Sequence, residues 1–271
     1  MRWLILLIVI FALYLFFIWP RLSRRKDMHT FFHTMFAHRG YHCASKGIPE
    51  NSMISFREAV LRGYGIELDI HLSKDGKLVV FHDDTLERMC GRQDVIEELT
   101  AEELTHCRLQ GTNETIPLFS DVLSMVNGQV PLLIELKMPS FSINICKEAY
   151  RILKNYPGPY MVQSFNPLGL RWFRKNVPDI LRGQLSSNLT SDPLKEPWIF
   201  RFTVKHLMGN FLGRPDFISY KLKDLPTPEV WILKNILHVP VAVWTLRTPA
   251  ALADGQNFYD MQIFEKQREN Y

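Results

Sequence analysis

Residues 66–84 read IELDIHLSKDGKLVVFHDD and contain two short strand candidates, Ile66–Ile70 and Leu78–Phe81, on either side of a charged turn. Several strand candidates of the chain, Leu78–Phe81 among them, are nearly continuous apolar runs, as expected of strands that are buried on both faces. Only His71–Lys77 lies between the two candidates, which is too short for the helix of a parallel crossover. The stretch therefore predicts two strands joined by a tight connection within a larger sheet.

Strands of the same kind recur along the chain and alternate with helical patterns. The other strand candidates are Met35–His38, Leu132–Leu136, Tyr160–Ser164, Leu181–Leu185, Phe217–Tyr220 and Val241–Trp244. Apolar residues at helical spacing predict helices over Asn51–Arg62, Phe119–Val126, Ile143–Lys154, Pro167–Lys175 and Pro228–Leu237. Eight strands alternating with helices predict an α/β fold, a (β/α)8 TIM barrel, with a doubly wound open sheet as the alternative. The charged residues 83–118 are expected to form a small insertion after the third strand.

The composition is that of an ordinary globular protein, with 46% apolar and 22% charged residues in a chain of 271. The net charge of +4 arises entirely within the first thirty residues, so the remainder is neutral. This distribution does not indicate a nucleic-acid partner, and no protein partner is implied. Four scattered cysteines lack the spacing of a zinc or redox site and predict free thiols in a reducing compartment.

An uncharged apolar run, WLILLIVIFALYLFFIW, extends from Trp3 to Trp19 and ends at Pro20. Seventeen residues of helix span roughly 25 Å, the short end of what a bilayer requires. A cleaved signal peptide is the alternative, but no small-residue cleavage site follows. We therefore expect residues 1–20 to be a transmembrane anchor in the lipid bilayer, 21–34 a basic juxtamembrane linker and 35–271 the barrel domain.

Basic residues are more numerous after the apolar run than before it. Arg21, Arg24, Arg25 and Lys26 follow it, whereas only Arg2 precedes it. The positive-inside rule counts Lys and Arg in short flanks, so this asymmetry predicts that the barrel faces the cytoplasm. The free cysteines agree with that side of the membrane.

Polar side chains fall at the carboxyl ends of several predicted strands, where barrels of this kind place their active sites. Glu67 and Asp69 are two residues apart and point the same way, and Glu135 lies in another strand after the apolar residues PLLI. Three converging carboxylates would repel one another unless a cation joined them, which favours a divalent ion with oxygen ligands. A salt-bridge network with Arg39 and Lys137 is the alternative.

Two histidines, His38 and His82, also follow predicted strands. Imidazole titrates near neutral pH, so a pair of histidines beside a cation suits general acid and base catalysis. The other histidines of the chain have no consistent placement and are interpreted as surface or core residues.

Four stretches of the chain carry motifs in a fixed order: HRG at 38–40, PENS at 49–52, ELDIHLSKDGKLVVFHDDTLER at 67–88 and IELK at 134–137. Their order and spacing resemble the pattern of the glycerophosphodiester phosphodiesterases, which runs HRG, PEN, E-x-D, a Lys-Asp-Gly turn, HD-x-x-L-x-R and E-x-K. The match is dense over residues 36–90 and continues in islands at 163–167 (QSFNP) and 244–245 (WT).

The resemblance implies a (β/α)8 barrel that hydrolyses a glycerophosphodiester to sn-glycerol 3-phosphate and an alcohol. It implies one divalent cation, magnesium or calcium, as the cofactor. The residues it assigns are His38 and His82 as the acid/base pair, Glu67, Asp69 and Glu135 as metal ligands, and Arg39, Glu50, Asn51 and Lys137 as substrate-binding residues. Trp244 would be a wall for the glycerol carbons, with a core tryptophan as the alternative.

The carboxyl-terminal part departs from the family pattern. The family usually ends in D-G-I-I-T-D-x-P, whereas LRTPAALADGQNFYDMQIFEKQ at 246–267 keeps only Asp254-Gly255. The family pattern therefore does not predict the final strand or one wall of the substrate pocket. Two other functions remain as alternatives: a lysophospholipase D-type activity on membrane lipid, and a catalytically silent barrel that binds a phosphorylated ligand.

Overall fold

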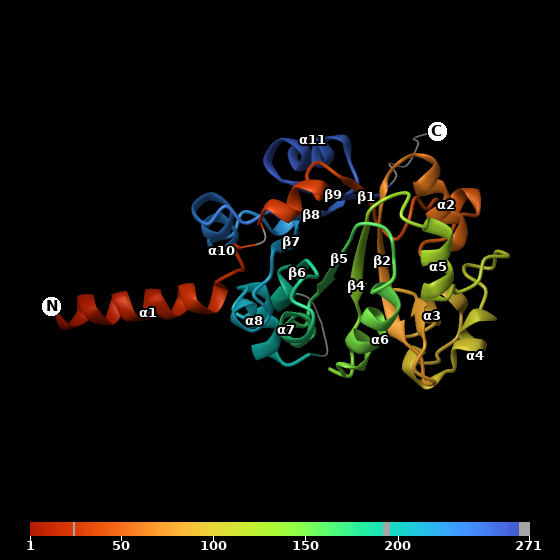
Figure 1. Ribbon diagram of the computed structural model, residues 1–271, viewed down its shortest axis with the longest axis horizontal. Helices are drawn as coiled ribbons and strands as arrows, with labels where there is room; N and C mark the ends of the chain where they lie inside the picture. Colours follow the sequence, from red (N-terminus) through yellow and green to blue (C-terminus); the bar gives the residue numbers. More distant parts are fainter. Residues whose placement is uncertain (24, 192–195, 266–271) are drawn as a thin grey trace.

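The computed structural model describes residues 1–23, 25–191 and 196–265, and a closed barrel of parallel strands lies at its centre (Figure 1). The sheet closes because β1 pairs in parallel with both β2 and β9. The barrel strands are β1 (Met35–Ala37), β2 (Gly65–Leu72), β4 (Leu132–Leu136), β5 (Tyr160–Ser164), β6 (Arg182–Ser186), β7 (Phe217–Lys221), β8 (Val241–Leu246) and β9 (Met261–Phe264). The predicted TIM barrel is confirmed, and the open sheet is excluded.

The sequence prediction was wrong about which strands make up the eight. Leu78–Val80 forms β3, which pairs antiparallel with β2, from Ile70 opposite Val80 to Leu72 opposite Leu78. The connection before β3 is too short for a crossover, so β3 can only turn back along β2. The eighth barrel strand is instead β9, which lies in the carboxyl-terminal segment that departs from the family pattern.

Helices surround the barrel (Figure 1). They are α2 (Met53–Leu61), α5 (Phe119–Val126), α6 (Asn144–Leu153), α7 (Pro167–Asn176), α8 (Trp198–Lys205), α9 (Asn210–Gly213), α10 (Pro228–Trp231) with the π-helical turn η6 (Ile232–Ile236), and α11 (Pro249–Phe258). Short 3-10 turns are η2 (Ala44–Lys46), η4 (Leu189–Ser191) and η5 (Leu222–Asp224). The sequence predicted the bounds of α5, α6 and α7 to within one residue, because each has a clear apolar stripe.

The expected insertion after β3 is confirmed. It contains α3 (Glu87–Cys90), η3 (Ile96–Glu98) and α4 (Ala101–Thr105), and it packs around its own apolar cluster, which includes Phe81, Leu86 and Leu104. The insertion starts at the end of β3, and its buried residues Phe81 and Leu86 lie on either side of the segment that carries His82.

Apolar side chains fill the amino-terminal end of the barrel. Phe36, Leu133 and Met161 belong to this cluster, and each lies two residues before a polar residue of the same strand or strand end. Because side chains alternate along a strand, each apolar residue shares its inward face with that polar residue. One set of inward rows therefore supplies an apolar floor at one end and a polar mouth at the other.

The segment before β1 completes this floor. The 3-10 helix η1 (Arg25–Phe31) buries Met28 and Phe31 in the same cluster. Upstream, the Arg21 guanidinium forms hydrogen bonds with both carboxylate oxygens of Asp216, each at 2.6 Å. The described residues of the segment 21–34, which the sequence suggested as a linker, thus pack on the barrel. Arg24 of that segment and residues 266–271 of the expected barrel domain lie outside the described residues.

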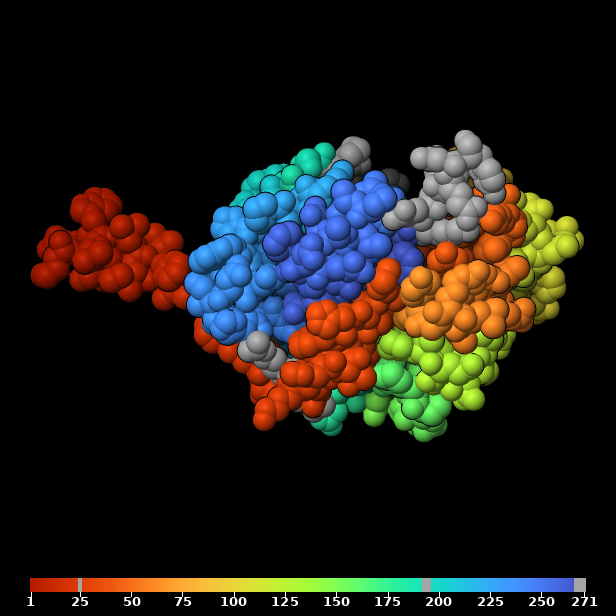
Figure 2. Space-filling model, turned by 90° about the horizontal axis from the view of Figure 1, so that it is seen from above, coloured from red at the N-terminus to blue at the C-terminus, as the bar shows by residue number. Residues whose placement is uncertain are grey.

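The helix α1 (Arg2–Ile18) projects from the rest of the molecule, as Figures 1 and 2 show. Its last turn contacts α9, where the Phe16 and Phe17 rings lie 5.8 and 5.2 Å from that of Phe211. Along the chain that the structure describes, no helix combines the length and the apolar character needed to cross a membrane. The predicted transmembrane anchor is therefore not supported.

Candidate active site

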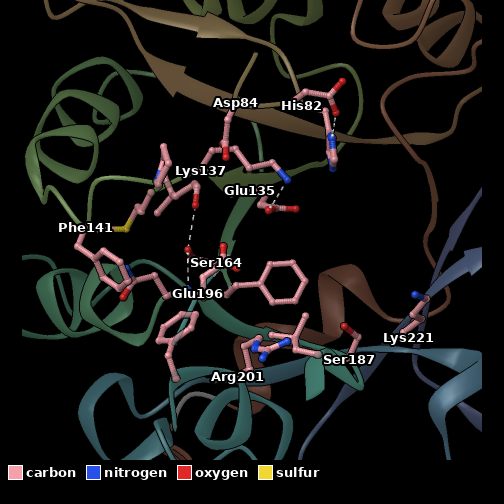
Figure 3. A pocket seen from close by; sticks show the side chains of 18 of the residues that line it. His82, Asp84, Glu135, Lys137, Phe141, Ser164, Ser187, Glu196, Arg201 and Lys221 are labelled. Carbon is pink, nitrogen blue, oxygen red and sulfur yellow. Dashed lines mark hydrogen bonds and ion pairs between the residues drawn. The ribbon is translucent and has the colours of Figure 1, made fainter. Parts of the chain in front are cut away.

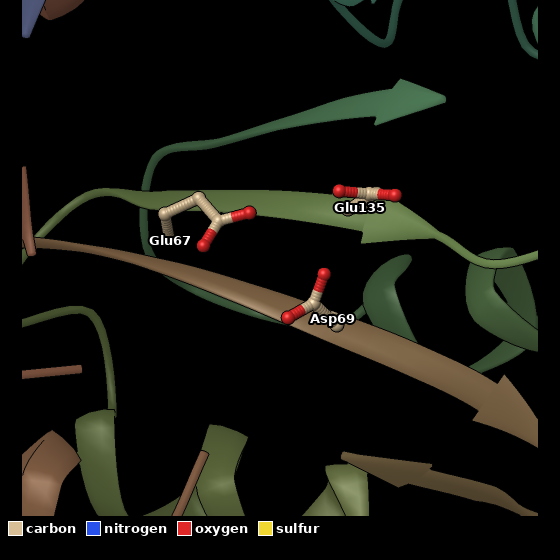
Figure 4. Close-up of side chains that lie close together, drawn as sticks. All are labelled: Glu67, Asp69 and Glu135. Carbon is tan, nitrogen blue, oxygen red and sulfur yellow. The ribbon is translucent and has the colours of Figure 1, made fainter. Parts of the chain in front are cut away.

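Three buried carboxylates meet at the mouth of the barrel (Figure 4). Glu67 and Asp69 come from β2 and Glu135 from β4, where Asp69 and Glu135 are partners in the parallel register. Each residue has a carboxylate oxygen within 4.8 Å of one on the other two. The structure thus brings together the three carboxylates that the sequence singled out.

Two cations lie against this cluster. The Lys137 ammonium is 2.6 Å from Glu135 Oε1 and 3.0 Å from Asp69 Oδ1. Arg39 has its Nε 3.6 Å from Asp69 Oδ2 and donates from Nη1 to Glu50 at 2.8 Å. Burial alone would raise the pKa of Asp69, but Lys137, with further positive charge nearby, holds it well below its usual value. The salt-bridge network considered as an alternative therefore exists around Asp69 and Glu135.

Glu67 is not accounted for by that network. Its oxygens accept from the Arg39 backbone N–H at 3.1 Å and the Gln163 amide at 3.4 Å. Burial, together with the carboxylates of Asp69 and Glu135, raises the pKa of Glu67 well above its usual value. A divalent cation would relieve this excess of negative charge, and an all-oxygen donor set fits magnesium or calcium.

A second indication of a cation comes from buried oxygens. Asn51 donates from Nδ2 to Asp69 at 2.9 Å, and Gln163 donates to Glu67. The carbonyl oxygen of each amide is buried, and among the described residues neither accepts a hydrogen bond. Buried polar atoms are usually satisfied, so these oxygens agree with a ligand in the cluster.

His38 follows β1 and is held by a carboxylate from the other end of the chain. Its Nδ1 donates to Glu265 Oε1 at 2.8 Å, and Arg247 donates to both oxygens of Glu265 at 2.6 Å. Burial lowers the pKa of His38 to about 4, although its hydrogen bond with Glu265 acts in the opposite direction. His38 is therefore a neutral imidazole at neutral pH with its Nε2 lone pair available.

His82 has a similar set of partners, drawn from its own neighbourhood. Its Nδ1 donates to Asp83 Oδ1 at 2.7 Å, and Arg88 donates from Nε to the other oxygen of Asp83 at 2.7 Å. Arg88 also donates from Nη2 to Glu50 at 2.6 Å. Glu50 thereby joins Arg88 to Arg39 and links the His82 side of the site to the carboxylate cluster.

The space in front of these groups has two compartments. A recess of about 60 Å³ is lined by His38, His82, Glu67 and Glu135 among others. An outer cavity of about 480 Å³ adjoins it (Figure 3). Trp244 and Phe165 line both compartments, with ring centroids 6.1 Å apart. Trp244 thus lines the recess and also packs against the apolar cluster at the amino-terminal end of the barrel.

A sequence model of the glycerophosphoryl diester phosphodiesterase family matches residues 38–267. The chain belongs to this family. It is 34% identical over 194 residues to the glycerophosphodiester phosphodiesterase of Bacillus altitudinis, covering 63% of this chain and 71% of that protein. A relative of the same name from Caldanaerobacter subterraneus is 31% identical over 174 residues, covering 60% and 68% of the two chains. The protein is therefore a phosphodiesterase.

Solved structures show the same fold. An Oleispira antarctica phosphodiesterase, solved with the product sn-glycerol-3-phosphate, matches with a TM-score of 0.71 at 24% identity, covering 87% of this chain and 94% of that one. The glycerophosphodiester phosphodiesterase of Thermotoga maritima matches with a TM-score of 0.63 at 26% identity, covering 86% and 94%.

The structure brings together all ten residues that the sequence proposed for the site. Seven of them line the recess: His38, Arg39, Glu67, His82, Glu135, Lys137 and Trp244. Asp69, Asn51 and Glu50 lie behind these and contact them through the bonds described above. No role was predicted for Asp83, Arg88, Arg247 or Glu265, although the first two lie within the quoted motif at 67–88.

Nothing in the sequence singled out Glu265, because only Asp254-Gly255 matched the family ending. The sequence interpretation used Asp254, which lies in α11. The structure places Asp260 directly before β9 and Glu265 directly after it. These two acidic residues are five apart, like the two aspartates of the D-G-I-I-T-D pattern. Attention to the spacing of the acids, rather than to the Asp-Gly pair, would have found Glu265.

Proposed function

We propose that the protein hydrolyses glycerophosphodiesters to sn-glycerol 3-phosphate and an alcohol, with one divalent cation and with two histidines as base and acid. The observation that carries this proposal is that His38 and His82 both line a recess beside Glu67 and Glu135. Imidazoles suit proton transfer near neutral pH, and the carboxylates suit magnesium or calcium.

The cationic groups suit the phosphoryl oxygens of the substrate. A cation held by Glu67, Asp69 and Glu135 would polarise one of these oxygens. Arg39 and Lys137 line the same recess and can donate hydrogen bonds to the other phosphoryl oxygens. Burial alone would lower the pKa of Lys137, but Asp69 and Glu135 raise it, so its ammonium keeps its charge.

The surroundings of the two histidines favour different roles. His38 lines only the recess and is neutral, so its Nε2 accepts the proton of the nucleophile. His82 lines both compartments, so it donates a proton to the oxygen of the departing alcohol on the outer side. The P–O bond to that alcohol breaks as the bond to the nucleophile forms, and the overall reaction consumes one water.

Removal of the cation tests the proposal. Turnover of glycerophosphoethanolamine, followed as release of sn-glycerol 3-phosphate, should be lost in excess EDTA and return when magnesium or calcium is added. Glu135→Gln should weaken cation affinity without unfolding the protein. The matched change Glu148→Gln, at a glutamate of α6 paired with Arg151, should have no effect. Full activity in excess chelator contradicts the cation, and no turnover of any glycerophosphodiester favours the catalytically silent barrel.

Lysophospholipids are a second candidate class of substrate, as expected for a lysophospholipase D-type activity. The observation that favours them is the apolar wall of the outer cavity, to which Met138, Phe141 and Phe200 contribute. This candidate requires the acylated glycerol, and not the leaving alcohol, to occupy that cavity. A lysophospholipid would keep its acyl chain on the glycerol that remains bound to phosphate. Comparison of lysophosphatidylcholine with glycerophosphocholine tests this candidate directly.

We also propose that α1 contacts a lipid bilayer and that the barrel lies on its cytoplasmic side. Most apolar side chains of α1 are exposed, including Trp3 and Leu7. Cys90, Cys107 and Cys146 are free thiols, as in a reducing compartment. The full chain should bind anionic vesicles, and a Leu7→Glu, Phe11→Glu variant should not.

The side of the membrane has its own test. A membrane-impermeant thiol reagent should label denatured Cys43 and Cys107 only after the membrane is opened. Labelling of these cysteines in intact cells contradicts the cytoplasmic side.

A further inference from the structure

The positions of the two histidines determine on which side of the phosphorus the leaving alcohol lies. His82 is the histidine that lines both compartments, whereas His38 lines only the recess. A substrate oxygen that takes a proton from His82 therefore faces the outer cavity. The phosphoryl group and the retained glycerol are left in the recess, where the Trp244 and Phe165 rings form a wall.

The outer cavity is larger than a small head group needs. Its volume of about 480 Å³ lies within the range of about 300–1,000 Å³ that is usual for pockets holding drug-sized ligands. The recess, at about 60 Å³, has no such room. A long substituent thus has space on the leaving side of the phosphorus and little on the glycerol side.

The walls of the outer cavity are mainly apolar. Met138, Phe141, Phe165, Leu189, Phe200 and Trp244 contribute to it. The Phe141 and Phe200 rings are in edge-to-face contact, with centroids 5.5 Å apart. Figure 3 shows Phe141 and Lys221 at opposite ends of the cavity, with His82, Glu135 and Lys137 along one wall. The cavity therefore leads from a charged wall to an aromatic end.

Aromatic walls can also bind a quaternary ammonium such as that of choline. Here the face of Trp244 already has a cation over it, because the Lys221 ammonium lies 5.8 Å from the ring centroid. Arg201 adds a second positive charge to the lining. The nearest carboxylate to His82, that of Asp83, is already bonded to His82 and Arg88. The carboxylates of Asp84 and Glu196 also line the cavity. Because charges of both signs line it, the apolar wall, and not the charge, is the feature that distinguishes one alcohol from another.

Apolar side chains continue outward from the cavity. At the aromatic end of the cavity, Phe141 is 43% exposed. Ile199 of α8, next to the lining residue Phe200, is 62% exposed. Trp198 of the same helix is also exposed. A chain longer than the cavity would therefore pass over apolar side chains rather than into water.

We propose that the outer cavity binds the leaving alcohol and that this alcohol carries an uncharged alkyl or acyl chain. The inference rests on the proposed hydrolysis of glycerophosphodiesters and adds the class of alcohol released. It places the apolar chain on the product that departs, whereas a lysophospholipid would keep that chain on the phosphate product.

A chain-length series tests this inference. The full chain, with magnesium or calcium, is assayed on the sn-glycero-3-phospho esters of ethanol, n-butanol and n-octanol, below their aggregation limits, and on glycerophosphocholine and lysophosphatidylcholine. We expect kcat/KM to rise by up to about fourfold for each methylene, the factor that corresponds to its full burial. We also expect the octyl ester to exceed both choline compounds.

The possible failures are distinguishable. Hydrolysis of the ethyl ester with a flat series, or with a preference for glycerophosphocholine, overturns the inference and leaves the proposed function standing. Faster hydrolysis of lysophosphatidylcholine than of the octyl ester places the chain on the glycerol side and also overturns it. No hydrolysis of any ester overturns the proposed function and the inference with it.

Variants of the cavity wall connect the series to the structure. Phe141→Ser and Phe200→Ser should each reduce the gain per methylene, because each removes part of the apolar wall. Phe258→Ser, at an exposed phenylalanine of α11, is the matched control and should leave the series unchanged. An unaltered chain-length dependence in both cavity variants, with both folded, contradicts the assignment of this cavity.

Discussion

The two histidines of the site have partners of the same kind, a carboxylate and an arginine, but these partners come from different parts of the chain. Each donates from Nδ1 to a carboxylate, which is bonded in turn by an arginine. For His82 the partners are Asp83 and Arg88, within a few residues on one connection. For His38 they are Glu265 and Arg247, which meet it only because the barrel closes between β1 and β9.

The two histidine–carboxylate–arginine sets also differ in burial. The His38 side chain is 11% exposed and that of His82 is 31% exposed. Burial lowers the pKa of His38 to about 4. Burial alone would raise the pKa values of Glu265 and Asp83, but their histidine and arginine partners hold both well below the usual range. Both carboxylates thus remain acceptors at neutral pH, and the two sets differ in the depth at which the imidazole lies.

Removal of either imidazole should give the largest effect. His38→Ala and His82→Ala should each lower kcat by about 10²–10⁴-fold on an alkyl ester, the usual range for loss of acid/base catalysis. A p-nitrophenyl ester separates the two, because its leaving group needs no proton. Most of the His82→Ala loss should disappear on that ester, and the His38→Ala loss should remain.

A third histidine provides the control for these variants. His206 also bonds a carboxylate, Glu229 at 2.6 Å, but lines neither compartment. His206→Ala should keep normal turnover. Near-normal turnover in either active-site variant would show that the histidine concerned is structural.

Removal of the carboxylate partners should have the next largest effect. Glu265→Gln should lower kcat by about 10–100-fold with little change in KM, the usual cost of losing a group that orients an acting side chain. Asp83→Asn should cost less, because water can reach the half-exposed His82. Glu265→Asp should restore part of the activity. If the loss in Glu265→Gln merely follows a loss of thermal stability, the positioning role of Glu265 is wrong.

Removal of the arginines should have a smaller effect and should break the symmetry between the sets. Arg247 bonds Glu265, whereas Arg88 bonds both Asp83 and Glu50. Arg247→Ala should therefore change kcat by less than about tenfold, below the effect of losing Glu265 itself. Arg88→Ala should also raise KM, because Glu50 holds Arg39. Equal effects on kcat and KM in both variants would contradict this difference.

The smallest expected effect is a shift in titration. In the metal-free protein, the His38 ring resonances should titrate with a midpoint near the pKa of about 4, below the ordinary histidine value. Because Glu265 raises the pKa of His38, Glu265→Gln should move the midpoint to lower pH. NMR of the histidine-labelled protein measures both. A midpoint near 6.5 in the unaltered protein would show that burial does not govern His38.

The comparison also explains what could be predicted from the sequence. The set around His82 is local, so the motif at 67–88 contains all of it. The three carboxylates were found because spacing on a strand fixes the side they face, and because the β2–β4 register then brings Asp69 to Glu135. Alternating apolar and amphipathic segments were sufficient for the barrel class.

The errors arose where contacts join distant parts of the chain. The strand β3 has the same apolar character as a barrel strand, and only its pairing direction distinguishes it. Glu265 acquires its role through barrel closure, which sequence spacing around residue 38 does not contain. The turn η1 has few apolar residues, and Met28 and Phe31 are buried only because the barrel floor needs them.

The junction between α1 and the barrel has a consequence for how the enzyme meets a large substrate surface. A flexible tether would let the mouth sample every direction, so linker length would set the effective concentration of substrate. Here Arg21 is bonded to Asp216, and Met28 and Phe31 fill the floor, so the chain that leaves α1 is held against the barrel from Arg21 onward. Whatever surface α1 contacts, the mouth is presented to it at one angle, and that angle sets which substrates come within reach.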